Sequence, residues 1–100
     1  MTLPLRLDVS EAAKRDMRAL LAYIGEENPK AAIHVAKQIV AKMQMLVTQP
    51  APGRPGRCKG TRELIVEHTP YIVAYRVNTD ERRILVLRIV HHAQRWPEKL

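Results

Sequence analysis

The sequence predicts an α+β fold with the element order β-α-α-β-β-β, in which a helical hairpin packs on one face of a mainly antiparallel four-stranded sheet. Three observations predict it. The first residues alternate between apolar and polar types, two segments with helical spacing follow, and three runs rich in β-branched residues fill the second half. A chain of 100 residues has room for one hydrophobic core, so residues 1–100 are expected to form a single domain.

The opening segment predicts a strand followed at once by a helix. Leu3–Val9 carries leucine or valine at odd positions and polar residues or proline at even ones, which is typical of a strand with one buried face. Ser10 can cap the helix, and Glu11 lies in its first turn, where the helix dipole favours a negative charge. The apolar stripe consists of Met17, Leu20, Leu21 and Ile24. Its spacing predicts a helix that ends near Glu27.

A second helix is predicted directly after the first. Asn28 supplies a cap and Pro29 the first helical position, and apolar residues then keep a helical period to about Thr48. Because the link is so short, the two helices are expected to form an antiparallel hairpin. Proline and glycine recur between Pro50 and Gly56 and argue against regular structure there.

Three strands are predicted in the second half, at Arg62–Glu67, Tyr71–Val77 and Arg83–His91. The short turns between them force antiparallel pairing, so this half is expected to be a β-meander. The helical hairpin can cover only one face of such a sheet. The opposite face is therefore expected to lie open and to offer room for a ligand or partner.

The chain is strongly basic, with a net charge of +7 and an isoelectric point near 10.1. Such an excess favours binding to phosphate backbones or acidic proteins, and a basic but inert surface is the alternative. The single cysteine, Cys58, excludes an intramolecular disulfide and fits a reducing compartment. With no signal-peptide pattern and no apolar run long enough to span a bilayer, we expect a cytoplasmic protein without membrane contact.

Positive charge is concentrated in the segment Gly53–Arg62, and two histidines and the only tryptophan lie in His91–Trp96. Metal-free cleavage of RNA needs a base for the 2′-hydroxyl, cations for the charged phosphorane and an acid for the leaving oxygen. The candidate cations of the first segment are Arg57, Lys59 and Arg62. Arg76 is expected to point into the open face, and His91 or His92 could act as base or acid near neutral pH. The same residues could equally form a basic surface for an acidic partner.

Several of these residues have a structural alternative. His91 can be a strand-end histidine satisfied by the backbone, and strand alternation would turn His92 to the other side. Trp96 could stack on an RNA base or pack down the tail. Glu63 and Glu67 share one face of their strand and are interpreted as solvated charges. No metal site or cofactor is expected, because CxxC, HExxH and complete P-loop patterns are absent.

The element order, together with the motifs GRPGR…GTREL, PYIVAYRV and RIVHHAQRWP, resembles the RelE/ParE superfamily of bacterial toxins. The resemblance covers essentially the whole chain. It implies the toxin component of a type II toxin–antitoxin system, which arrests growth and is neutralised by a cognate antitoxin whose segment wraps the toxin. RelE-like members cut mRNA in the ribosomal A site without a metal, whereas ParE-like members inhibit DNA gyrase and are not nucleases.

For a RelE-like activity, the resemblance implies phosphate contacts by Arg57 and Arg62 and a catalytic or orienting role for His91. The residues expected to contact RNA or another target are Arg54, Lys59, Arg76, His92, Arg95 and Trp96. The tail lacks the tyrosine that several ribosome-dependent members place near the C-terminus. ParE-like members often end the last strand in a histidine that is followed by a few residues and an aspartate, and here Gln94-Arg95-Trp96 stands instead. We expect a ribosome-dependent mRNA endonuclease, with a non-catalytic gyrase inhibitor as the alternative. An inactive module that binds an acidic partner is the third hypothesis.

Overall fold

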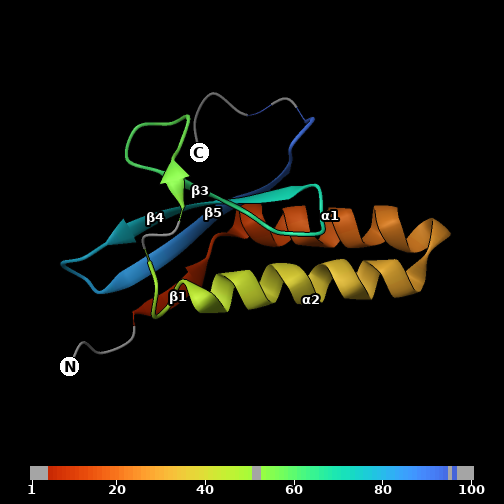
Figure 1. Cartoon of the computed structure of the whole chain (residues 1–100), viewed down its shortest axis with the longest axis horizontal. Helices are drawn as coiled ribbons and strands as arrows, with labels where there is room; N and C mark the ends of the chain where they lie inside the picture. The colour runs from red at the N-terminus through yellow and green to blue at the C-terminus, as the bar shows by residue number, and fades with distance from the viewer. Residues whose placement is uncertain (1–4, 51–52, 95, 97–100) are drawn as a thin grey trace.

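The structure is a computed structural model that describes residues 5–50, 53–94 and 96. The described residues form two helices and five strands. In chain order these are β1 (Arg6–Val9), α1 (Glu11–Glu27), α2 (Pro29–Met45), β2 (Arg54–Pro55), β3 (Arg62–Ile65), β4 (Tyr71–Asn78) and β5 (Arg83–His91). Figure 1 shows the helical hairpin along one side of the sheet, with its turn extending beyond the strands. The predicted α+β fold is confirmed.

The sheet is mixed, with the strand order β1-β5-β4-β3-β2. β1 runs parallel to β5, where Val9 pairs with Val86, and β3, β4 and β5 form the predicted antiparallel meander. In the described part of the chain, the sheet has five strands, one more than the four that the sequence predicts. Arg54 and Pro55, in a segment predicted to be irregular, form a two-residue strand antiparallel to β3 at the edge of the sheet. Proline can occupy such an edge because no further strand needs its missing N–H.

Most element boundaries agree with the sequence prediction, and β5 agrees at both ends. α2 ends at Met45, before the predicted Thr48, because the residues that follow form turns. β3 ends at Ile65 instead of Glu67, since the chain turns shortly afterwards and His68 takes a positive φ of 65°. The start of the predicted opening strand, up to position 4, lies outside the described residues.

Both helices begin at the capping residues that the sequence predicts. The Ser10 side chain accepts a hydrogen bond from the Ala13 N–H (3.0 Å), and the Asn28 side chain accepts one from the Ala31 N–H (3.0 Å). Ser10 also donates to the carbonyl oxygen of Leu87 in β5 (2.8 Å), which ties the start of α1 to the sheet. No helix in the described part of the chain is long and apolar enough to cross a membrane.

The core lies between the helical hairpin and one face of the sheet. The helical stripes pack there against odd-numbered residues of β4 and their partners on β5. The largest fully buried side chains are Tyr75, Ile39, Leu46, Ile84, Val66, Val73, Val86 and Val90. Because the chain has no phenylalanine, Tyr75 supplies the largest volume at the centre, and its hydroxyl reaches the backbone of the segment after α2. This tyrosine therefore links the core to the loop described below.

The opposite face of the sheet was predicted to lie open, but only part of it does. Ile72, Ala74 and Val90 point away from the helices and are nevertheless buried. The basic segment after β2 folds back over this face, where the Arg57 N–H donates to the side chain of Glu63. The chain thus covers part of this face with a loop, which the helix and strand patterns of the sequence did not indicate.

Candidate functional site

The basic segment Gly53–Arg62, here named the arginine loop, is held in place by the central tyrosine of the core. The Tyr75 hydroxyl donates to the Pro50 carbonyl oxygen (3.0 Å) and accepts from the Gly53 N–H (2.9 Å). A Cβ atom at Gly53 would lie 2.5 Å from that hydroxyl oxygen, so only glycine allows this close approach. Burial raises the pKa of the Tyr75 hydroxyl, which therefore stays protonated and able to donate. The start of the loop is fixed to the core in this way.

A buried carboxylate organises the arginine loop. Glu63 of β3 is only 3% exposed, and its oxygens accept hydrogen bonds from the Arg54 side chain (3.2 Å) and from the Arg57 backbone N–H (2.8 Å). The Arg57 Nε atom lies 3.7 Å from the same carboxylate. A buried carboxylate is tolerated only where charge and hydrogen bonds compensate for lost water. The two arginines therefore neutralise Glu63, and part of their own charge is used within the molecule.

The interpretation of Glu63 as a solvated charge is wrong, because its pairing with Ala74 of β4 places the side chain beneath the loop. The same interpretation is confirmed for Glu67, which is exposed and pairs with Lys42 (2.7 Å). The hydrogen bond from Lys42, assisted by its charge, lowers the pKa of the Glu67 carboxyl. Two glutamates that the sequence places on one strand face thus have different environments.

The tryptophan of the C-terminal segment lies against the arginine loop. The Arg57 guanidinium carbon is 4.0 Å from the centre of the Trp96 ring, which is a cation–π contact. The ring is partly buried, and its Nε1 atom has no hydrogen-bond partner among the described residues. Trp96 thus occupies the packed position, one of its two sequence-based interpretations, and Arg57 contacts Trp96 and Glu63 at once.

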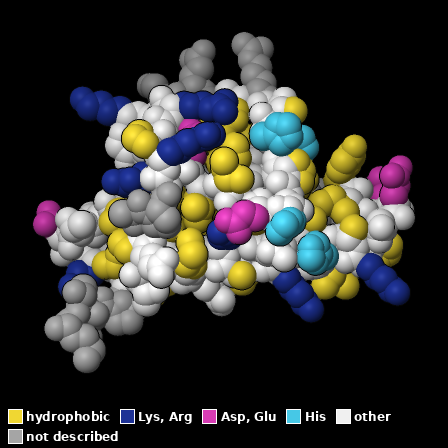
Figure 2. All heavy atoms as spheres, in the orientation of Figure 1, with side chains coloured by type: hydrophobic (Ala, Val, Ile, Leu, Met, Phe, Trp, Pro, Cys, Tyr) yellow, Lys and Arg dark blue, Asp and Glu magenta, His cyan; other side chains and the backbone are white. Residues whose placement is uncertain are grey.

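The remaining cationic candidates differ in whether they form contacts within the protein or are exposed and able to contact a partner. Arg62 is half-buried and donates to the Gly53 carbonyl oxygen (2.9 Å), so it braces the loop. Lys59 and Arg76 are exposed and form no ion pair within the described part of the chain, and Arg76 lies on the face away from the helices, as predicted. Arg95, a further candidate, lies outside the described residues. Figure 2 shows Lys and Arg side chains gathered where β2 and the arginine loop lie in Figure 1, with an acidic side chain between them.

His91 lies on the helical side of the sheet, because it pairs with Tyr71 of β4. Its ring makes an edge contact with the Tyr71 ring, with centroids 5.5 Å apart, and its Nδ1 atom accepts a hydrogen bond from the Ala93 N–H (3.1 Å). This is the alternative in which the backbone satisfies the histidine.

The prediction that His92 turns to the other side is wrong. His92 follows the end of β5, where strand alternation no longer applies, and its ring stacks on His91 with centroids 4.9 Å apart.

The three candidate catalytic residues do not come together. Arg62 pairs with Tyr75 and His91 pairs with Tyr71, so the two lie four positions apart along β4 and on strands that flank it. With ~3.3 Å per residue and ~4.8 Å between strands, their Cα atoms are ~16 Å apart. Arg57 lies over the opposite face of the sheet. The expectation that a cationic loop faces His91 across an open sheet is therefore not met.

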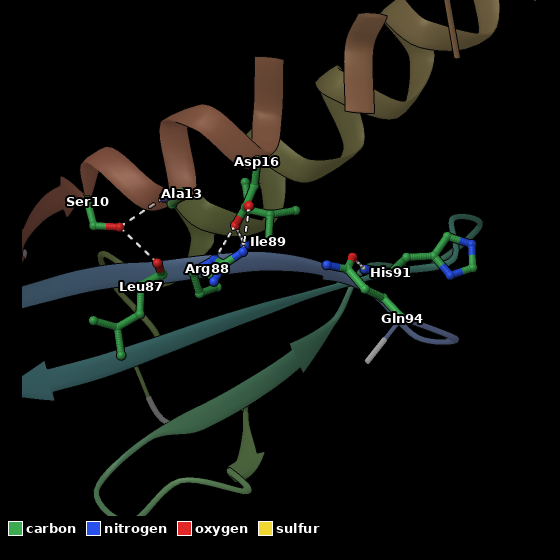
Figure 3. Close-up of polar contacts among 8 residues, drawn as sticks. All are labelled: Ser10, Ala13, Asp16, Leu87, Arg88, Ile89, His91 and Gln94. Carbon is green, nitrogen blue, oxygen red and sulfur yellow. Dashed lines mark hydrogen bonds and ion pairs between the residues drawn. The ribbon is translucent and has the colours of Figure 1, made fainter. Parts of the chain in front are cut away.

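A second polar cluster, which the sequence prediction missed, joins α1 to the outer edge of β5 (Figure 3). The Asp16 carboxylate accepts two hydrogen bonds from the Arg88 guanidinium (2.7 and 2.9 Å) and one from the Ile89 N–H (2.9 Å). The hydrogen bonds to Asp16 raise the pKa of Arg88. Further along the same edge, the Gln94 side chain accepts a bond from the His91 N–H (3.3 Å). Arg88, a charge in the middle of an apolar strand, is the signal in the sequence that could have indicated this cluster.

A pocket of about 290 Å³ lies between α1 and the end of β5. Its polar lining residues are Asp16, Tyr23, Tyr71, His91 and Gln94. Burial, and to a smaller extent the neighbouring Tyr23, raises the pKa of the Tyr71 hydroxyl. Among the described residues, no group of three or more His, Cys, Asp or Glu side chains could hold a metal ion. His91 thus belongs to this pocket and not to the arginine loop.

Two helices packed on a mixed sheet place the chain in the class of RelE/ParE-like folds. A family model described as the ParE toxin of the type II toxin–antitoxin system parDE matches residues 7–96. Because the match spans most of the chain, the protein belongs to the ParE toxin family and is the toxin of a type II toxin–antitoxin system.

Individual relatives agree with this assignment. The protein named "Putative toxin Y4kP" from Sinorhizobium fredii (strain NBRC 101917 / NGR234) is 40% identical over 88 residues, which is 88% of either chain. Among solved structures, the chromosomal ParDE TA system from P. aeruginosa matches with a TM-score of 0.77 and 27% identity, over 87% of this chain and 95% of that one. The RelBE2 toxin–antitoxin complex from Mycobacterium tuberculosis matches with a TM-score of 0.63 and 22% identity, over 94% and 98%. The second structure supports the fold alone.

Proposed function

We propose that this toxin acts by binding and inhibiting DNA gyrase, and not by cutting RNA. The observation that carries the proposal is the position of His91, which faces α1 and Tyr71 while the loop arginines pair with Glu63 over the opposite face. Metal-free cleavage requires the base, the acid and the cations to surround one phosphate. The described residues do not assemble such a group, and the sequence resemblance implies gyrase inhibition for ParE-like toxins.

The surface proposed to contact gyrase is the part of the far sheet face around Glu63, here named the arginine face. It consists of Arg54, Arg57, Ile65, Arg76 and Trp96. Arginine and tryptophan are the residue types that most often dominate the energy of protein interfaces. Ile65 is 53% exposed, although it lies on the sheet, and adds an apolar contact. Because Glu63 already holds the loop arginines in place, less side-chain freedom is lost when a partner binds them.

We further propose that a cognate antitoxin with an acidic segment neutralises the toxin. The solved structures that share this fold contain toxin–antitoxin systems from P. aeruginosa, M. tuberculosis and E. coli. A net charge of +7 favours association with an acidic chain and accelerates the encounter.

Ribosome-dependent mRNA cleavage is the second candidate activity. The observation that favours it is the exposure of Lys59 and Arg76, which form no ion pair within the described residues and could contact phosphates. It would require an acid or base other than His91 close to the arginine face. This candidate therefore predicts that His91→Ala keeps its nuclease activity.

Supercoiling of relaxed plasmid by purified gyrase tests the proposal. The toxin is expected to inhibit supercoiling, and Arg76→Ala is expected to raise the inhibitory concentration about tenfold, as for an interface hot spot. Arg15→Ala is the matched control, because it removes the same charge from the exposed surface of α1. It should inhibit like the wild type. Full supercoiling at every toxin concentration would exclude gyrase as the target, and equal loss in both variants would exclude the arginine face as the contact.

A further inference from the structure

We infer that the pocket between α1 and the end of β5 binds a carboxylate side chain, a glutamate or an aspartate, from an acidic segment of a partner protein. The inference concerns a surface on the helical side of the sheet and goes beyond the proposed action on gyrase. It rests on what the pocket offers: hydrogen-bond donors that have no partner among the described residues, an acidic residue that is already neutralised, and an apolar floor.

The two tyrosines of the pocket present donors. Tyr71 is 8% exposed, and its hydroxyl forms no hydrogen bond with any of the described residues. Burial raises its pKa, so the hydroxyl is protonated at neutral pH and can donate. Tyr23 of α1 stands beside it and is 75% exposed, at the mouth of the pocket. A carboxylate oxygen that enters the pocket would therefore meet phenol O–H groups.

His91 and Gln94 also offer hydrogen-bond donors to the pocket, because the acceptor atom of each side chain is already bonded. The Nδ1 atom of His91 accepts from the Ala93 N–H, so the neutral ring carries its hydrogen on Nε2. The Gln94 side-chain oxygen accepts from the His91 backbone N–H, which leaves its NH₂ group as a donor. The polar atoms that remain available on this side of the pocket are thus donors.

The rest of the lining selects a carboxylate over a phosphate. Asp16 is an acid in the wall, but Arg88 and the Ile89 N–H bond both of its oxygens, which compensates its charge. Among the described residues, the lining includes no lysine or arginine, so these residues offer no cation to a doubly charged phosphate. Ala19 and Leu20 form an apolar floor together with Ile89, and they match the aliphatic stem of a glutamate. The net charge of +7 draws such an acidic segment toward the protein.

The test uses the whole chain and a small probe, acetyl-glutamate amide, followed by the ring signals of His91 and Tyr71 in NMR spectra. We expect a saturable shift with this probe and none with the neutral acetyl-glutamine amide. Tyr71→Phe removes the phenol O–H, and His91→Phe replaces the imidazole by an aromatic ring without a donor. Each is therefore expected to weaken binding about tenfold. His34→Phe is the matched control, because His34 is exposed on α2 away from the pocket, and it should bind like the wild type.

Three outcomes would overturn the inference. The first is a shift that grows linearly with either probe. The second is equal saturation in the wild type, Tyr71→Phe and His91→Phe. The third is tighter binding of inorganic phosphate than of acetyl-glutamate amide, which would make the pocket a phosphate site. Each of these leaves the supercoiling result untouched, so failure here and failure of the gyrase proposal are distinguishable.

Discussion

Substitution of Glu63 by glutamine tests whether one buried carboxylate organises the arginine loop. The change keeps the shape of the side chain and removes its charge. One end of the new amide can still accept from the Arg57 N–H, but the other end then presents an NH₂ group to the Arg54 guanidinium, where two donors face each other. Glu63→Gln is therefore expected to loosen the loop and its contact with Trp96.

The expected loss in the free energy of unfolding follows from the hydrogen bonds that Glu63→Gln weakens. A hydrogen bond to a charged group contributes about 1.5–3 kcal/mol, and both arginines are about half exposed (53% and 51%), which reduces their share. We expect a loss of about 2 kcal/mol from a total stability of about 5–15 kcal/mol. For a domain of this size, that corresponds to a fall in Tm of about 8–16 °C.

Urea unfolding followed by the fluorescence of Trp96, the only tryptophan, measures both effects. The unfolding midpoint should fall with an unchanged slope, and the emission of the folded variant should shift to longer wavelength as the ring becomes wetter. Glu67→Gln is the matched control, since Glu67 is an exposed glutamate whose ion pair within the described part of the chain is with Lys42. An exposed pair contributes little to stability, so a clearly smaller loss is expected. An unchanged midpoint and emission in Glu63→Gln would refute the role assigned to the carboxylate.

Three further predictions follow from other contacts. Asp16→Asn leaves the Arg88 guanidinium, whose side chain is 24% exposed, without its counter-ion, and should cost about 2–4 kcal/mol in urea unfolding; a loss within experimental error would mean that the pair does not stabilise α1 on β5. Burial raises the pKa of Tyr75, so its contribution should be complete below the unfolded value near 10 and be lost as the pH rises through the folded pKa. Tyr75→Phe should be less stable at pH 7, because it leaves the Gly53 N–H unbonded, and should lose less stability between pH 9 and 11; equal alkaline losses would contradict this. His91→Ala should still arrest growth, since the proposed action on gyrase does not need the imidazole; full relief of toxicity would restore His91 as a functional residue.

The parts of the fold that depend on local chemistry could be predicted from the sequence. Ser10 and Asn28 cap the helices as expected, because capping involves only the next three residues. The boundaries of β5 were also predictable, since a run that is apolar apart from Arg88 ends there at the histidine pair. β2 could not be predicted, because Arg54 and Pro55 have little preference for a strand. They form one only by pairing with the edge of β3.

The candidate site could be predicted only in part, because the face of each side chain depends on pairing between distant segments. The sequence indicated the cations of the arginine loop and the exposure of Arg76. It did not indicate that Glu63 would be buried beneath the loop, which follows from its pairing with β4. The placement of His91 on the helical side follows in the same way from its partner Tyr71. A loop that contains four cations and no acid could have suggested that a nearby carboxylate must compensate them.

The central claim is that this toxin stops growth by binding gyrase, without breaking RNA. The most direct test induces the toxin in growing cells and analyses one culture in two ways, by the supercoiling of a resident plasmid and by mapping the 5′ ends of translated mRNA. We predict a loss of negative supercoiling with no new 5′ ends inside codons. New 5′ ends within codons, together with normal supercoiling, would contradict the account and identify an mRNA endonuclease.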